Sequence, residues 1–117
     1  MNGDPAQATP RPPATQLPTS LSTLFDATVA GLGPVERATE GSAVVVRWEG
    51  RIFAALDGDR IEVDLGTTVG EAARRTPDAT DSSRGPDWVT FQPTLLDRYA
   101  VDRAVAWIEH AWRRAAG

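Results

Sequence analysis

The chain has 117 residues, no cysteine and a formal net charge of −4, and all twelve of its basic residues are arginine. This composition excludes disulfides, cysteine nucleophiles and any chemistry that needs a lysine, such as Schiff-base formation. The length allows one domain, and no stretch approaches the roughly 20 apolar residues of a membrane span. Because the N-terminus lacks the basic start and apolar run of a signal peptide, we expect a cytoplasmic protein.

The first nineteen residues are predicted to be a disordered, proline-rich tail. Large apolar side chains are almost missing from residues 1–19, so little burial can offset the entropy of ordering them. The segment also contains Pro5, Pro10, Pro12, Pro13 and Pro18, which remove backbone donors. We therefore place a single domain at residues 20–117.

A first helix is predicted to begin near Ser20. Apolar residues recur there at three- and four-residue spacing and form one stripe, made by Leu21, Leu24, Phe25, Val29 and Leu32. Thr19 or Ser20 can cap the first turn. Gly31, Gly33 and Pro34 then end the helix.

A meander of strands is predicted next. A short strand covers residues 35–38, and two β-prone runs follow at 44–48 and 51–56. The two-residue loop between these runs ends in Gly50, which is typical of a tight hairpin. A three-residue turn then leads into residues 60–65, where apolar and charged side chains alternate strictly.

These turns predict a pairing register. The expected cross-strand pairs are Trp48 with Arg51, Val46 with Phe53, Val44 with Ala55, Ala55 with Ile61, and Phe53 with Val63. One face of the sheet would then be apolar, formed by Val44, Val46, Phe53, Ala55, Ile61 and Val63. The other face would mix apolar and charged groups, formed by Val45, Arg47, Ile52, Ala54, Glu62 and Asp64.

The C-terminal half is predicted to contain two helices and one strand. A capping-box pattern at Thr68 starts a short helix, and residues 76–86 are rich in loop-forming residues. Residues 88–91 form a strand, and residues 100–116 form the last helix. Its apolar stripe consists of Val101, Ala104, Val105, Ile108, Ala111, Trp112 and Ala115.

Together these elements predict an α+β fold. Strands joined by short turns must be antiparallel, and the amphipathic helices need a sheet face to cover. We expect a two-layer sandwich with three helices and an antiparallel sheet of four to five strands, in the order α-β-β-β-β-α-β-α.

The sequence offers no clear catalytic group. The densest acidic cluster, formed by Asp57, Asp59, Glu62 and Asp64, fits turn and solvent-facing positions and lacks the spacing of an EF-hand. His110 has no second histidine or cysteine with which to bind a metal, and we expect it on the exposed face of the last helix. Ser82 and Ser83 lack the glycines of a nucleophile elbow. We therefore expect no catalytic residues, no metal and no cofactor.

Arginine and tryptophan near the predicted turns are the best candidate binding residues. Arg47, Trp48 and Arg51 surround the first hairpin turn, and Arg60 follows the second. Arginine grips phosphates and both residue types stack on bases, which suits nucleic acid. The alternative is that nearby acidic residues (Glu49, Glu62 or Asp64 for Arg47) neutralise the arginines and that Trp48 covers the core. Trp88 and Trp107, with Trp48, either line a ligand pocket or fill a small core.

The chain resembles the MmcQ/YjbR-like family over roughly residues 21–116. The resemblance rests on four segments, at residues 50–54, 61–65, 85–89 and 111–114. It implies a two-layer α+β fold akin to secretion-chaperone-like domains, small bacterial members and a suggested DNA-binding role. The chain departs from the family in lacking lysines in the hairpin strands and in its longer proline-rich start. A luciferase-like α+β family shares the tryptophan-valine strand before a final helix.

These observations support three hypotheses. The first is a non-enzymatic binding module that uses the mixed sheet face and the hairpin tips, with nucleic acid or another protein as partner. The net charge disfavours nucleic acid. The second is a small-molecule-binding domain or minor enzyme with a tryptophan-lined pocket between sheet and helices. The third is a homodimer formed through the open sheet face, and none of the three involves a membrane.

Overall fold

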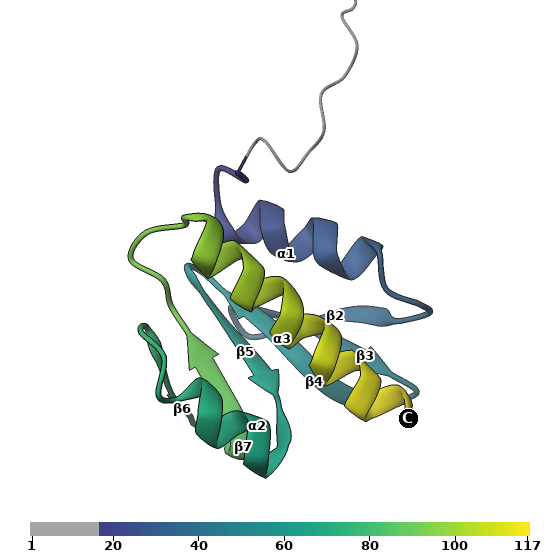
Figure 1. Cartoon of the computed structure of the whole chain (residues 1–117). Helices are drawn as coiled ribbons and strands as arrows, with labels where there is room; N and C mark the ends of the chain where they lie inside the picture. The colour runs from purple at the N-terminus through teal and green to yellow at the C-terminus, as the bar shows by residue number, and fades with distance from the viewer. Residues whose placement is uncertain (1–16) are drawn as a thin grey trace, which may run out of the picture.

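A six-stranded antiparallel sheet forms one layer of the structure, and helices pack against one of its faces (Figure 1). The computed structural model describes residues 17–117, so the predicted tail at residues 1–19 lies almost wholly outside the described part. The described elements are α1 (Leu21–Ala30), β2 (Glu36–Glu40), β3 (Ala43–Trp48), β4 (Arg51–Asp57), β5 (Arg60–Asp64), α2 (Gly66–Ala73), β6 (Ala79–Ser82), β7 (Gly85–Phe91) and α3 (Arg98–Ala116).

The α+β class and the three helices are confirmed for residues 17–117, but the sheet has one strand more than predicted. The strand order is β2-β3-β4-β5-β7-β6, so the chain order is α-β-β-β-β-α-β-β-α. The additional strand, β6, lies inside the predicted loop at residues 76–86. Its sequence, Ala-Thr-Asp-Ser, has no apolar alternation, and β6 forms because an edge strand needs only the backbone ladder to β7.

The predicted register is correct at the first turn and wrong beyond it. Trp48 pairs with Arg51 as expected, but the β3–β4 ladder shifts between Val46 and Arg47, so that Val46 pairs with Ala54. Phe53 becomes the extra residue of a β-bulge in β4. The expected pairs of Val46 with Phe53 and Val44 with Ala55 are therefore wrong.

The β4–β5 turn has two residues, one fewer than predicted. Asp57 pairs with Arg60 across a two-residue turn, in which Gly58 has a φ of 65°. Consequently β4 and β5 pair as Ala54–Val63, Ala55–Glu62 and Leu56–Ile61, in place of the expected Phe53–Val63 and Ala55–Ile61.

The bulge decides which residues of β4 enter the core. Phe53 and Ala54 are both fully buried and both belong to the core under the helices. Ala55 pairs with Val45 and Glu62 and faces away from the helices, which corrects its predicted placement and that of Ala54. The core also contains Val46, Ile61 and Val63, as predicted, whereas Val44 is only half-buried.

The helices contribute the stripes that their periodicity predicted. Leu21, Leu24, Phe25 and Val29 of α1 are buried, and the N–H of Thr23 donates to Ser20 Oγ at 3.1 Å. In α3 the buried residues are Ala100, Ala104, Ile108, Ala111 and Ala115, with Val101, Val105 and Trp112 packed beside them. Asp97 caps α3, so this helix starts two residues earlier than expected.

Helix α2 does not start as predicted. It begins at Gly66, directly after β5, and no side chain caps it, so the capping box expected at Thr68 is wrong. The start is set by tertiary contacts, because the N–H of Leu65 donates to Asp87 O at 2.9 Å. Within the described residues, none of the helices combines the length and apolar character that a membrane span requires.

Candidate functional site

The six predicted binding residues do not form one site. Arg47, Trp48 and Arg51 lie around the β3–β4 turn, whereas Arg60 lies at the opposite end of the sheet, directly after the β4–β5 turn. The two remaining residues are Trp88 on β7 and Trp107 on α3. The β3–β4 turn is therefore the place where the structure brings the largest number of them together.

A surface hollow of about 420 Å³ lies beside this turn. Its lining consists of Pro34, Val35, Glu36, Arg47, Trp48 and Glu49, and we call it the β3–β4 hollow. The turn is tight, with a φ of 47° at Glu49 and of 84° at Gly50, the left-handed values that a two-residue hairpin loop requires. The start of β2 forms the other wall.

The charges of the β3–β4 hollow are partly paired. Arg47 Nε lies 3.4 Å from Glu36 Oε1, so Glu36 is its partner, in place of the expected Glu49, Glu62 or Asp64. The Arg47 side chain is 38% exposed and that of Glu36 is 67% exposed. Trp48 is half-buried and packs against the core, which agrees with the interpretation that it covers the core edge.

Arg51 belongs to a second group of charges, centred on Asp64. The Asp64 side chain is 11% exposed, and its carboxylate lies 3.5 Å from Arg51 Nη2 and 3.3 Å from Arg114 Nη2. Arg114 lies against Gly66 at the start of α2, where a Cβ would come within 2.7 Å of its guanidinium. This group ties the end of β5 to α3 and is structural.

Arg60 and Trp107 also have structural partners. Arg60 Nη2 lies 3.6 Å from Asp57 Oδ2 across the β4–β5 turn. The ring of Trp107 meets the ring of Phe91 edge to face, with centroids 5.2 Å apart. The Arg103 guanidinium lies 4.7 Å from the centroid of the Phe91 ring and 4.2 Å from that of the Tyr99 ring. Both distances are typical of cation–π contacts.

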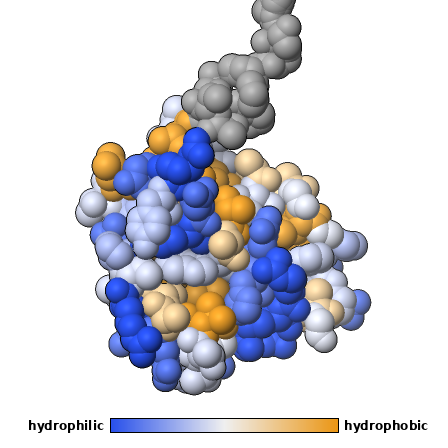
Figure 2. Space-filling model, viewed as in Figure 1, coloured by the Kyte–Doolittle hydropathy of each residue, from blue (hydrophilic) through white to orange (hydrophobic). Residues whose placement is uncertain are grey.

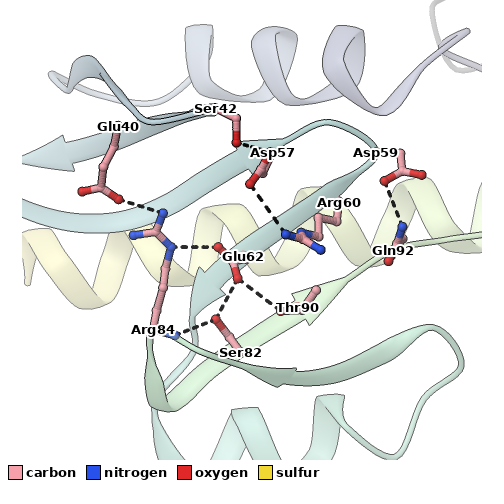
Figure 3. Close-up of polar contacts among 10 residues, drawn as sticks. All are labelled: Glu40, Ser42, Asp57, Asp59, Arg60, Glu62, Ser82, Arg84, Thr90 and Gln92. Carbon is pink, nitrogen blue, oxygen red and sulfur yellow. Dashed lines mark hydrogen bonds and ion pairs between the residues drawn. The ribbon is translucent and has the colours of Figure 1, made fainter.

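An arginine outside the predicted set organises the face of the sheet opposite the helices, which we call the outer face (Figure 3). Arg84, in the β6–β7 turn, donates from Nε to Glu62 Oε1 at 2.8 Å and places Nη2 3.0 Å from Glu40 Oε1. Glu62 also accepts from Ser82 Oγ at 3.0 Å and from Thr90 Oγ1 at 3.4 Å. The Arg84 network (Arg84, Glu62, Glu40, Ser82 and Thr90) thus connects β2, β5, β6 and β7.

The Arg84 network shields apolar residues of the outer face. Val45 is 2% exposed and Ala55 is fully buried, although neither belongs to the core under the helices. On the outer face, both residues lie between Glu62 of β5 and strand β2. The Arg84 side chain extends over them to reach Glu62 and Glu40. The guanidinium also lies 5.5 Å from the Trp88 centroid, which gives this tryptophan a structural contact.

The pKa of Arg84 reflects this setting. Burial by itself would lower the pKa of the guanidinium, but the hydrogen bonds and charges of Glu62 and Glu40 outweigh it and raise the pKa above its ordinary value. Arg84 therefore carries its charge throughout the pH range in which the protein is handled. Residues 76–86 have the composition of a loop, so the local sequence carries no signal for the role of Arg84.

The groups considered for catalysis are engaged elsewhere. His110 is partly exposed, and its Nε2 lies 3.2 Å from Leu65 O, so this nitrogen donates to the carbonyl. Ser82 donates to Glu62 and its oxygen accepts from the N–H of Arg84 at 3.1 Å, so it holds the β6–β7 turn. Among residues 17–117, no cluster of three or more histidine or acidic side chains is arranged to hold a metal ion.

A second hollow, of about 300 Å³, lies at the other end of the sheet. It is formed by the start of α1, the β4–β5 turn and the loop after β7, and it is lined by Thr19, Ser20, Leu21, Ser22, Gly58, Asp59, Pro93, Thr94 and Leu96. Asp59 accepts from Gln92 Nε2 at 2.9 Å. This second hollow contains none of the predicted binding residues.

Comparison with known proteins adds no relative: no family model, curated protein or solved structure matches the chain.

Proposed function

We propose that the protein is a non-enzymatic binding module whose docking surface is the β3–β4 hollow and the adjoining turn, and whose partner is another protein. The observation that carries this proposal is the convergence of Arg47 and Trp48 on one hollow whose lining is partly apolar. Tryptophan and arginine are the residues that most often anchor protein interfaces. The volume of about 420 Å³ accommodates a side chain of the partner.

The charge distribution supports a protein partner over nucleic acid. Most arginines of the described residues lie within ion-pair distance of a carboxylate: Arg37, Arg47, Arg51, Arg60, Arg74, Arg84 and Arg114. A nucleic-acid-binding surface needs cations that are free to neutralise phosphates. With a net charge of −4, the chain supplies few such cations.

The hydropathy of the surface supports a small docking site. On the side of the molecule seen in Figure 2, hydrophilic residues separate the apolar patches from one another. Obligate interfaces present broad, continuous apolar surfaces, whereas transient ones are smaller and more polar. This side, on which the helices lie, therefore offers no broad apolar surface, and the outer face on the far side is crossed by the charged Arg84 network, so we favour a transient partner over a permanent homodimer.

We also propose that the chain is related to the MmcQ/YjbR-like family, on the sequence segments that resemble it. A small-molecule pocket between sheet and helices, walled by several tryptophans, has less support. The two hollows described above lie at opposite ends of the sheet, and Trp48 is the one tryptophan that lines either of them.

The proposal is tested by selecting peptides from a displayed random library against the full chain and mapping them by NMR. We expect the selected peptides to shift the backbone amides of residues 35–36 and 47–50. Glu49→Arg should weaken their binding, whereas Glu71→Arg on the exposed face of α2 should leave it unchanged. Peptides that map elsewhere, or tight salt-dependent binding of duplex DNA, would overturn the proposal.

A further inference from the structure

The charge balance of the β3–β4 hollow identifies the kind of group that it receives. Its lining contains two carboxylates, Glu36 and Glu49, and one cation, Arg47. Glu36 lies 3.4 Å from Arg47 Nε, so these two charges largely cancel. The Glu49 carboxylate is left as the uncompensated charge, in a turn where its side chain is exposed.

The walls of the β3–β4 hollow suit a cation that has an apolar stem. Pro34, Val35 and Trp48 supply apolar surface against which methylene groups can pack. A tryptophan ring attracts an ammonium or guanidinium group, and an exposed carboxylate beside it adds a charge-assisted hydrogen bond. A lysine or arginine side chain has both parts, an apolar stem and a cationic end.

An anionic ligand fits the same hollow poorly. To reach the guanidinium of Arg47, it would have to displace Glu36 and would lie near Glu49. Both contacts bring like charges together, which is unfavourable. The negative net charge of the whole chain also attracts cationic partners over longer distances.

We propose that the β3–β4 hollow receives a basic side chain, lysine or arginine, of a partner protein. This inference rests on the proposed function, because it assigns a ligand class to the same hollow. It predicts that the partner presents a basic residue on an exposed segment, and that binding weakens as the ionic strength rises.

The test is an NMR titration of the full chain with three capped amino acids. The probes are Nα-acetyl-lysine methylamide, its norleucine analogue, which keeps the stem and lacks the charge, and Nα-acetyl-glutamate methylamide. We expect the lysine probe to shift the Trp48 indole N–H and the amides of Glu49 and Gly50. Norleucine should bind about three- to fivefold more weakly, the loss of roughly one exposed ion pair, and the glutamate probe should not bind.

Two charge-neutralising variants complete the test. Glu49→Gln should reduce the affinity for the lysine probe by about three- to fivefold, and Glu71→Gln, on α2, should leave it unchanged. Equal binding of norleucine and lysine at the hollow would overturn this inference and leave the proposed function intact. If no probe shifts these signals, the inference also fails. The proposed function fails as well if the peptide selection yields no ligand at this hollow or if duplex DNA binds tightly.

Discussion

The Arg84 network offers the sharpest test of how the outer face is held together. In Arg84→Met the thioether side chain keeps much of the apolar stem over Val45 and Ala55 but removes the guanidinium. Glu62, whose side chain is 12% exposed, then keeps only the hydroxyl donors of Ser82 and Thr90. A carboxylate that is mostly out of water loses its cation, and this loss is the physical cause of the expected destabilisation.

The size of the expected loss in the free energy of unfolding follows from the burial of the Arg84–Glu62 ion pair. Removing one partner of a fully buried ion pair costs about 3–5 kcal/mol, whereas an exposed pair contributes below about 1 kcal/mol. The side chains of Arg84 and Glu62 are 20% and 12% exposed, which places them nearer the buried limit. We therefore expect Arg84→Met to lower the free energy of unfolding by about 2–3 kcal/mol, which for a domain of this size lowers Tm by roughly 10–20 °C.

The assay is urea unfolding followed by circular dichroism, with a double-mutant cycle. Glu62→Gln removes the charge that Arg84→Met leaves unpaired, so the double variant should cost less than the sum of the singles by about 1–2 kcal/mol. The matched control is Arg37→Met, because the Arg37–Asp26 pair is 2.8 Å long but 40% and 57% exposed. Its cost should stay below about 1 kcal/mol.

Two results would contradict a stabilising role of the Arg84–Glu62 pair. One is a cost for Arg84→Met that does not exceed the cost for Arg37→Met. The other is simple additivity of Arg84→Met and Glu62→Gln, since additive effects mean that the two side chains do not interact. Either result would show that backbone pairing alone holds the β6–β7 turn over the sheet.

Three further predictions concern the fold and are measured by the same unfolding assay. Gly66→Ala should lower the free energy of unfolding by about 2–4 kcal/mol, because a φ of 81° is strained for alanine and the new Cβ would lie 2.7 Å from Arg114 Nη1. The control Gly58→Ala, whose Cβ would meet no atom within 4 Å, should lower it by only about 1 kcal/mol. Equal costs would show that the Arg114 contact adds nothing. Asp97→Ala should cost about 0.5–2 kcal/mol by removing the cap of α3, and Asp97→Ser should restore most of it. Phe53→Ala should cost about 3–5 kcal/mol, and a cost near that of a surface substitution would contradict its place in the core.

The elements in which apolar residues recur at a regular helical or strand spacing could be predicted from the sequence. The stripes of α1 and α3 lie against the sheet as expected, since a helix with one apolar face has few ways to bury it. The hairpin at Gly50 was also predictable, because few residues other than glycine adopt its φ of 84°. In contrast, β6 has neither apolar alternation nor β-branched residues beyond Thr80, so local sequence carries no signal for it.

The candidate site could be predicted only in part. Arg47 and Trp48 were identified from their position at a hairpin turn, and they do line the β3–β4 hollow. Glu36 was not identified from the sequence, because its contact with Arg47 depends on the β2–β3 register. Arg84 was missed for a similar reason: its partners Glu62 and Glu40 are distant in sequence and meet it only across the folded sheet.

The α+β class, the two main helices, the strands from β3 to β5 and the lack of cysteine and lysine chemistry could all be predicted from the amino-acid sequence. These properties depend on composition and short-range periodicity, which the chain carries before it folds. In contrast, four features became visible only in the folded chain: the bulge at Phe53, the edge strand β6, the start of α2 and the ion-pair partners of the arginines. The start of α2 and the partners of Arg51, Arg84 and Arg114 depend on contacts between segments far apart in sequence. The bulge and β6 depend on pairing with a neighbouring strand, where packing and pairing outweigh local preference.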